Sequence, residues 1–214
     1  MSPFVLITGI VPGGMGQDFV DAAVSAGAGG GTVLKGRGTA SNKILNVLGI
    51  GDSARDIAYT ITDTDKCDAV IGHIKANAGS RRYRHGILFT VDVMSKMQSG
   101  TFEQGERTMK NIQKELISVI VNQGYADDVM EAARNAGASG GTILNARGTA
   151  KEGDAKFFGL TIVPEKEMLM LIVDHEQSEK VFNAVKNLPC LDKKGSGIIF
   201  SSPVENFTTL GNNS

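Results

Sequence analysis

The sequence predicts an α+β protein of two tandem ferredoxin-like (βαββαβ) domains, each an antiparallel sheet with its helices on one face. Two observations carry this prediction. Residues 26–40, AGAGGGTVLKGRGTA, return 110 positions later as AGASGGTILNARGTA, with 11 of 15 residues identical. An internal repeat of this length indicates two similar domains. The hydrophobic pattern around each copy then gives the order strand, helix, strand, strand, helix, strand.

The first copy supplies its elements from residue 5 to residue 93. Residues 5–11 are apolar and rich in β-branched side chains, which favours a buried strand. Apolar residues at helical spacing follow, and Gly27 ends that helix. The predicted strands are 5–11, 32–36, 44–50 (weak), 57–62 and 86–93, and the predicted helices are 17–26 and 66–78.

The second copy repeats this order with a shift that grows from 110 to 111 at the third strand. The predicted strands are 116–122, 141–146, 157–162, 168–173 and 197–204, and the predicted helices are 126–136 and 176–188. Residues 164–167, PEKE, concentrate charge between two strand segments, and we predict a solvated turn there. The first copy has Ala54, Arg55 and Asp56 in their place.

The repeat sets the domain boundaries at residues 1–95 and 113–214. The segment between them, 96–112, is polar, contains two glycines and has no counterpart in the repeat. We interpret it as a linker, in which a short helix from about residue 106 stays open.

The composition bounds the function classes. The 22 basic and 23 acidic side chains nearly cancel, which argues against a dedicated nucleic-acid binder. We find no apolar run of about 20 residues and no signal peptide, so we predict no membrane insertion. Cys67 and Cys190 lie far apart without a CxxC pattern, as in cytosolic proteins. We therefore expect a cytoplasmic protein.

The duplicated segment is the first candidate site. It places Thr32 and Arg37 in the first copy, and Thr142 and Arg147 in the second, beside glycines that allow a ligand to come close. Arginine forms forked hydrogen bonds to phosphate or carboxylate. A tight turn with a solvated arginine is an equally good interpretation.

The loop before the last strand of each copy is the second candidate. Glycines beside cations can form a nest of backbone N–H groups for an anion. A solvated basic turn is the alternative. The residues concerned are Arg84 and Gly86 in the first copy, and Lys193, Lys194, Gly195 and Gly197 in the second.

Residues 13–16, between a strand and a helix, are a third and weaker candidate. A phosphate loop lies in this position in some folds, but the full glycine pattern is absent and a structural turn is favoured. His73, His85 and His175 are scattered, and no nucleophile elbow or metal-binding spacing occurs. We predict no catalytic residue, no metal site and no enzyme.

The second copy, residues 116–210, resembles the nitrogen regulatory PII signalling proteins and their PII-like branch. The runs DVMEAAR, AGASGGTILNARGTA, FFGLTIVPEKEML and GSGIIFSSPV carry the resemblance, and AGAGGGTVLKGRGTA and HGILFTVDV extend it to the first copy. The resemblance implies trimeric assembly around sheet faces, ATP or ADP in clefts between domains, and a loop after the second strand that contacts regulated proteins.

The resemblance also assigns residues. It puts Gly30, Thr32, Gly140 and Thr142 along the adenine and ribose. It puts Arg37, Gly38, Arg147 and Gly148 at the base of the signalling loop, and Gly195 and Gly197, with Gly86 as counterpart, in the phosphate loop. Ile198 and Ile87 stand where the family has lysine, so Lys193, Lys194 or Arg84 would have to substitute. The loop 150–156 is short and lacks a tyrosine for uridylylation.

These observations predict a PII-like regulatory protein of the nitrogen-regulation type, which binds a small anionic effector between domains and modulates a protein partner. Adenine nucleotides are candidate effectors, and no cofactor is required. We expect a homo-oligomer, with a trimer favoured. One alternative is a structural or interaction module that has lost ligand binding. A weaker one is a protein that handles divalent metals.

Overall fold

The computed structural model describes most of the chain: residues 4–39, 53–78, 86–93, 95–98, 101–104, 112–147, 156–157, 160–161, 165–191 and 197–211. The predicted weak strand 44–50 and the basic loops around Arg84 and Lys193 lie outside these residues.

The four predicted helices are confirmed, each with ends within two residues of the prediction. They are α1 (Gly16–Ser25), α3 (Cys67–Ala78), α4 (Ala126–Asn135) and α5 (His175–Lys186), with single 3-10 turns at Thr64–Lys66 and Pro189–Leu191. The strands of the first copy are β1 (Phe4–Pro12), β2 (Thr32–Gly38), β3 (Ser53–Asp63) and β4 (Gly86–Val93). Those of the second are β7 (Lys114–Asn122), β8 (Thr142–Arg147), β11 (Glu165–Asp174) and β12 (Gly197–Leu210).

The predicted fold class is wrong, because the sheets are not those of two separate ferredoxin-like domains. The eight strands form one closed antiparallel barrel in the order β1-β3-β2-β8-β11-β7-β12-β4. Two separate ferredoxin-like sheets would each have open edges. An open edge exposes unpaired N–H and C=O groups, and closure into a barrel removes it. Pairing between strands so far apart in sequence has no local signal.

The chain also divides into two compact units, and two strands pass from one unit into the other. Unit 1 contains residues 1–35, 53–114 and 202–214, and unit 2 contains residues 36–52 and 115–201. Unit 1 therefore takes the end of β12, which pairs with β4 from Glu205↔Thr90 to Leu210↔Gly86. Unit 2 takes the end of β2. The domain boundaries predicted from the repeat stay predictions.

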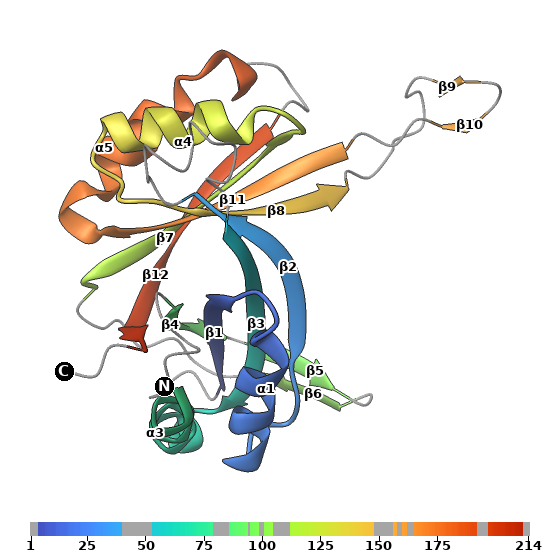
Figure 1. Cartoon of the computed structure of the whole chain (residues 1–214), viewed down its shortest axis with the longest axis vertical. Coiled ribbons are helices and arrows are strands. Elements are labelled where there is room, and N and C mark those ends of the chain that lie inside the picture. Colours follow the sequence, from blue (N-terminus) through green and yellow to red (C-terminus); the bar gives the residue numbers. More distant parts are fainter. Residues whose placement is uncertain are drawn as a thin grey trace. The chain divides into compact units, whose positions relative to one another are not determined.

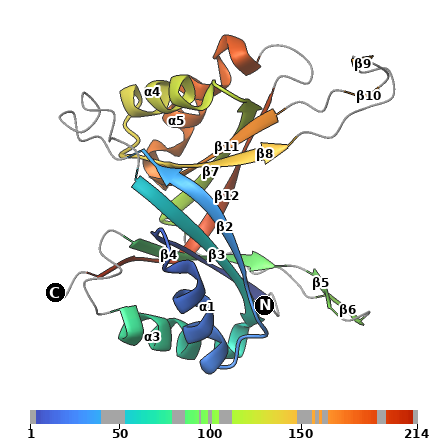
Figure 2. The same cartoon turned by 45° about the vertical axis from the view of Figure 1, so that its right-hand side comes forward.

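In unit 1, α1 packs against α3 and against β1 and β3 (Figure 2). Apolar side chains from both helices and the sheet form one core, in which Phe19 and Val70 are fully buried. The helical spacing of the apolar residues in α1 is thus explained by a single buried face.

In unit 2, α4 and α5 pack together on one face of the sheet that contains β7, β8 and β11 (Figure 1). The core between them includes fully buried Val129, Ala133, Val181 and Leu171. This core lies directly behind the strand ends that carry the candidate site.

Two short hairpins lie outside the barrel. In the predicted linker, β5 (Ser95–Gln98) pairs antiparallel with β6 (Thr101–Gln104). The single strand predicted at residues 157–162 is instead divided: β9 (Lys156–Phe157) pairs with β10 (Leu160–Thr161). Each strand is so short that its hydrophobic pattern carries little information.

Within the described residues, no helix has the length and apolar character needed to cross a membrane.

Candidate functional site

The two copies of the duplicated segment pair with each other in unit 2. The last residues of β2 lie antiparallel to β8, with Arg37 opposite Ile143 and Gly38 opposite Thr142 (Figure 1). Because the strands run in opposite directions, the end of one segment meets the start of the other. Arg37 and Gly38 are thereby brought beside the start of β8 at Thr142.

Thr39 fastens the end of β2 to the glycine turn before β8. Its backbone N–H donates to the Gly141 carbonyl at 3.0 Å, and its hydroxyl donates to the same carbonyl at 3.0 Å. The Gly141 N–H donates back to Thr39 Oγ1 at 2.9 Å. Arg134 on α4 donates to the Thr39 carbonyl. Thr39 is 5% exposed, so these bonds lie mostly away from water.

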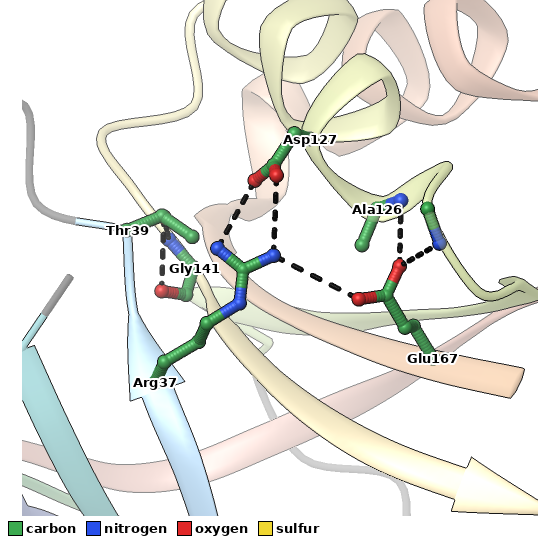
Figure 3. A network of polar contacts seen from close by, with 7 residues as sticks. Arg37, Thr39, Ala126, Asp127, Gly141 and Glu167 are labelled. Atoms are coloured by element: carbon green, nitrogen blue, oxygen red, sulfur yellow. Dashed lines mark hydrogen bonds and ion pairs between the residues drawn. The ribbon is translucent and has the colours of Figure 1, made fainter. Parts of the chain in front are cut away.

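The guanidinium of Arg37 lies between two carboxylates (Figure 3). Nη1 and Nη2 donate to the two oxygens of Asp127, both at 3.2 Å, which is a forked geometry. Nη2 also lies 3.8 Å from Glu167 Oε1. The Arg37 side chain is 31% exposed and that of Asp127 is 71% exposed, so solvent reaches this pair.

Glu167 corrects the predicted solvated turn at residues 164–167. Glu165 begins β11, and Glu167 is buried at 7% exposure. Its Oε2 accepts hydrogen bonds from the N–H groups of Gly124 at 2.9 Å and Ala126 at 3.2 Å. Ala126 is the first residue of α4, so the carboxylate caps the positive end of this helix.

Asp56 makes the same contacts in unit 1. It is 1% exposed, and its Oδ2 accepts from the N–H groups of Gly14 and Gly16, both at 3.0 Å. Lys35 on β2 pairs with its other oxygen at 2.8 Å. Burial alone would raise the pKa of Asp56, but the hydrogen bonds from Lys35, Gly16 and Gly14 and the charge of Lys35 lower it.

This arrangement explains the third candidate site. The N–H groups of the loop at residues 13–16 point at an anion, as in a phosphate loop. The anion is the carboxylate of Asp56 from the same chain. The geometry therefore favours the structural turn over a phosphate site.

The glycines of the duplicated segments fall into two kinds. A Cβ on Gly31 would lie 2.7 Å from the Tyr59 carbonyl, and one on Gly141 would lie 2.7 Å from Leu171 and 3.0 Å from the Met170 carbonyl. These two glycines are required by packing. A Cβ on Gly140 would meet nothing within 4 Å, and Gly140 has no positive φ. The fold itself therefore does not require a glycine there.

The other predicted site residues do not join this cluster. Gly30, Thr32 and Gly86 belong to unit 1, and Gly30 has a φ of 130°. Arg147 ends β8, about 16 Å along the strand from Thr142. Gly197 begins β12, and a Cβ there would lie 2.6 Å from the Ile120 carbonyl. The predicted residues outside the described part of the chain are Arg84, Gly148, Lys193, Lys194 and Gly195.

Sequence reasoning missed the carboxylates of the cluster. Asp127 looked like an ordinary acidic residue in the first turn of a helix. A signal for Glu167 was present, because both copies have an acid at this position: Asp56 and Glu167 are 111 residues apart, the shift of the repeat in this region.

No group of three or more His, Cys, Asp and Glu side chains in the described ranges is arranged to hold a metal ion.

The cluster thus combines an arginine fork near the surface with the junction of two paired strands. Residues 114–212 match the family model "Nitrogen regulatory protein P-II". This part of the chain, just under half of it, is therefore similar to the P-II family of regulatory signalling proteins. This similarity is compatible with the prediction that the chain is not an enzyme. No curated protein matches the chain.

Proposed function

We propose that this P-II-type regulatory protein binds a small anionic effector in unit 2, at the junction of β2 and β8. The observation that supports the proposal most directly is Gly140. It has open space around it and no conformational need to be glycine, and it directly precedes Gly141, which is hydrogen-bonded to Thr39 at the end of β2. Close approach of a ligand accounts for a glycine at such a position.

The Arg37–Asp127 pair provides the means of response. A surface ion pair contributes only about 0–1 kcal/mol, so another anion can replace the Asp127 carboxylate at low cost. Glu167 would stay in place, because its second oxygen is held by two backbone N–H groups. Effector binding would thus exchange one carboxylate on Arg37 and leave the cap of α4 intact. Such an exchange near the end of β2 would change the surface that a protein partner meets.

Calorimetry with adenylates, cyclic dinucleotides and bicarbonate tests this proposal. Adenine nucleotides are the first candidates, on the resemblance to PII proteins. We expect Arg37→Ala and Gly140→Leu to abolish binding. We expect Asp127→Ala to strengthen it by about fivefold, because the competing carboxylate is removed. Lys180→Ala, on the exposed surface of α5, serves as the control. The absence of heat with every ligand would contradict the proposal.

A second function is favoured by one observation: the fork of Arg37 is already engaged by Asp127 and Glu167. On this alternative, the contacts of Arg37 serve only to hold the end of β2 in place. The protein is then an interaction module without an effector. It requires that Arg37→Ala and Arg147→Ala leave all ligand effects unchanged while a protein partner still binds. The oligomeric state and the identity of the partner stay predictions from the sequence.

A further inference from the structure

A cavity in unit 1 lies between α3 and the end of β12, apart from the residues discussed so far. Its volume is about 310 Å³, at the lower end of the range of about 300–1,000 Å³ for ligand pockets. This size suits a metabolite smaller than a nucleotide. The lining residues are Asp68, Ile71, Gly72, Lys75, Asn206, Phe207 and Thr208.

The helix side of the cavity is one face of α3. Asp68, Ile71, Gly72 and Lys75 have the spacing i, i+3, i+4 and i+7, which places them in one row. Gly72 is exposed in the middle of this row, and a Cβ on it would meet nothing within 4 Å. Glycine is unfavourable inside a helix, so a packing or functional reason is expected. Here its missing side chain leaves the cavity open.

The strand side of the cavity is an irregular part of β12. The pairing of β12 with β4 shifts register between Glu205 and Thr208. Asn206 has a φ of 50°, and among the described residues it is the sole non-glycine with a positive φ. Its side chain donates to Thr90 Oγ1 at 3.2 Å, which holds this conformation. Bulges of this kind re-aim a neighbouring side chain and are common next to functional sites.

Phe207 is the side chain that the bulge places in the cavity wall. It is half-buried, and Lys114 Nζ lies 4.8 Å from its ring centroid. Together with Ile71, which is 7% exposed, it gives the cavity an apolar surface. An apolar side chain of a ligand would pack here.

The row of residues on α3 begins with an acidic residue, Asp68, and ends with a basic one, Lys75. Asp68 and Lys75 are exposed, and neither has an ion-pair or hydrogen-bond partner within the part of the chain that the structure describes. Long side chains on a helix tend to lean toward its N-terminus, which favours an approach of the Lys75 ammonium toward the Asp68 end of the row. A ligand between them meets a carboxylate and an ammonium group together.

We propose that this cavity binds a free α-amino acid with an apolar or aromatic side chain. Asp68 would accept from the ligand's ammonium group, Lys75 would donate to its carboxylate, and Phe207 and Ile71 would pack against its side chain. Asp68 near the start of α3 and Lys75 near its end also suit the helix dipole. That role alone does not account for the exposed glycine between them or for the bulge at Asn206.

Titration of the full-length protein with L-phenylalanine and L-leucine, followed by calorimetry and by NMR, tests the proposal. We expect saturable binding at millimolar concentration or below. Phenethylamine and phenylacetate each lack one charge and should bind about tenfold more weakly or worse. Binding as tight by either analogue, or no binding of both amino acids, would overturn the proposal.

Variants locate the site. Gly72→Leu fills the cavity while it improves helix propensity, so we expect lost binding with an unchanged or raised melting temperature. Asp68→Asn and Lys75→Met should each weaken binding by about tenfold. Undiminished binding by Gly72→Leu would refute this location. The inference does not rest on the proposed function, because Arg37→Ala in unit 2 should leave phenylalanine binding unchanged.

Discussion

Replacement of Glu167 gives the most quantitative test of the unit 2 network. Glu167→Ala removes the acceptor of two backbone N–H groups, of which the one on Ala126 is buried and the one on Gly124 is partly buried. A buried donor left without a partner costs about 1–3 kcal/mol, so we expect a total loss of about 2–4 kcal/mol. Glu167→Gln keeps an amide oxygen for both donors. It loses only the charge beside Arg37 and at the start of α4, about 1 kcal/mol.

Urea unfolding of both variants and of the unmodified protein measures these free energies. Glu131→Ala, an exposed residue of the same helix, is the matched control and should change stability by less than about 0.5 kcal/mol. We expect the loss of stability to be largest for Glu167→Ala, smaller for Glu167→Gln and smallest for the control. This order follows if the carboxylate stabilises the fold mainly through its hydrogen bonds and not through its charge. Equal losses for Glu167→Ala and Glu167→Gln would show that the carboxylate acts through its charge alone, and our reasoning would be refuted.

Three further predictions concern the repeated features. The lowered pKa of Asp56 means that its stabilising effect is present above the unfolded pKa of about 3.9 and lost as pH falls through the folded pKa. The stability difference between the unmodified protein and Asp56→Asn, measured by urea unfolding, should therefore shrink below about pH 4; a constant difference would contradict this. Gly141→Ala should cost about 1–3 kcal/mol in thermal unfolding because its Cβ meets Leu171, whereas Gly140→Ala should be neutral or slightly stabilising; similar effects of the two changes would disprove the distinction. Thr39→Val should speed hydrogen exchange of the Gly141 amide and cost about 1–3 kcal/mol, and Thr39→Ser should restore most of the loss; exchange unaffected by the valine would count against the bond.

The helices and most strands could be predicted because their signal is local. Residues 17–26 have apolar side chains at helical spacing, and Gly27, with a φ of 102°, follows the end of α1 as the sequence indicated. By contrast, the barrel depends on pairing between strands far apart in sequence. The partners Gly38 and Thr142 are 104 residues apart, and no local pattern specifies their register.

Some residues of the candidate site could be proposed from the sequence because they stand in the repeated segment. Arg37, Gly38, Gly140 and Thr142 were identified because they recur in the repeat. Glu167 was misassigned because a run of charged residues usually indicates a solvated turn. In a strand, however, successive side chains point to opposite faces, so one charged residue of a run can be buried while its neighbours are not. Glu167 is buried, whereas its direct neighbours Lys166 and Met168, on the opposite face, are partly exposed. In its buried position, the carboxylate of Glu167 accepts hydrogen bonds from two backbone N–H groups.

The cations that face the two buried carboxylates show how the copies have diverged. In unit 1, Lys35 on β2 pairs with Asp56. The repeat places Asn145 at the position of Lys35 in the second copy, and Asn145 lies opposite Glu167 in the pairing of β8 with β11. An amide supplies no charge, so the second copy has no cation of its own at this point. Arg37, two residues after Lys35 and on the same face of β2, approaches Glu167 instead. Strand β2 of the first copy thus provides a cation for each of the two carboxylates. The contact with Glu167 gives Arg37 a role beyond its place in the repeat, where Arg147 is its counterpart.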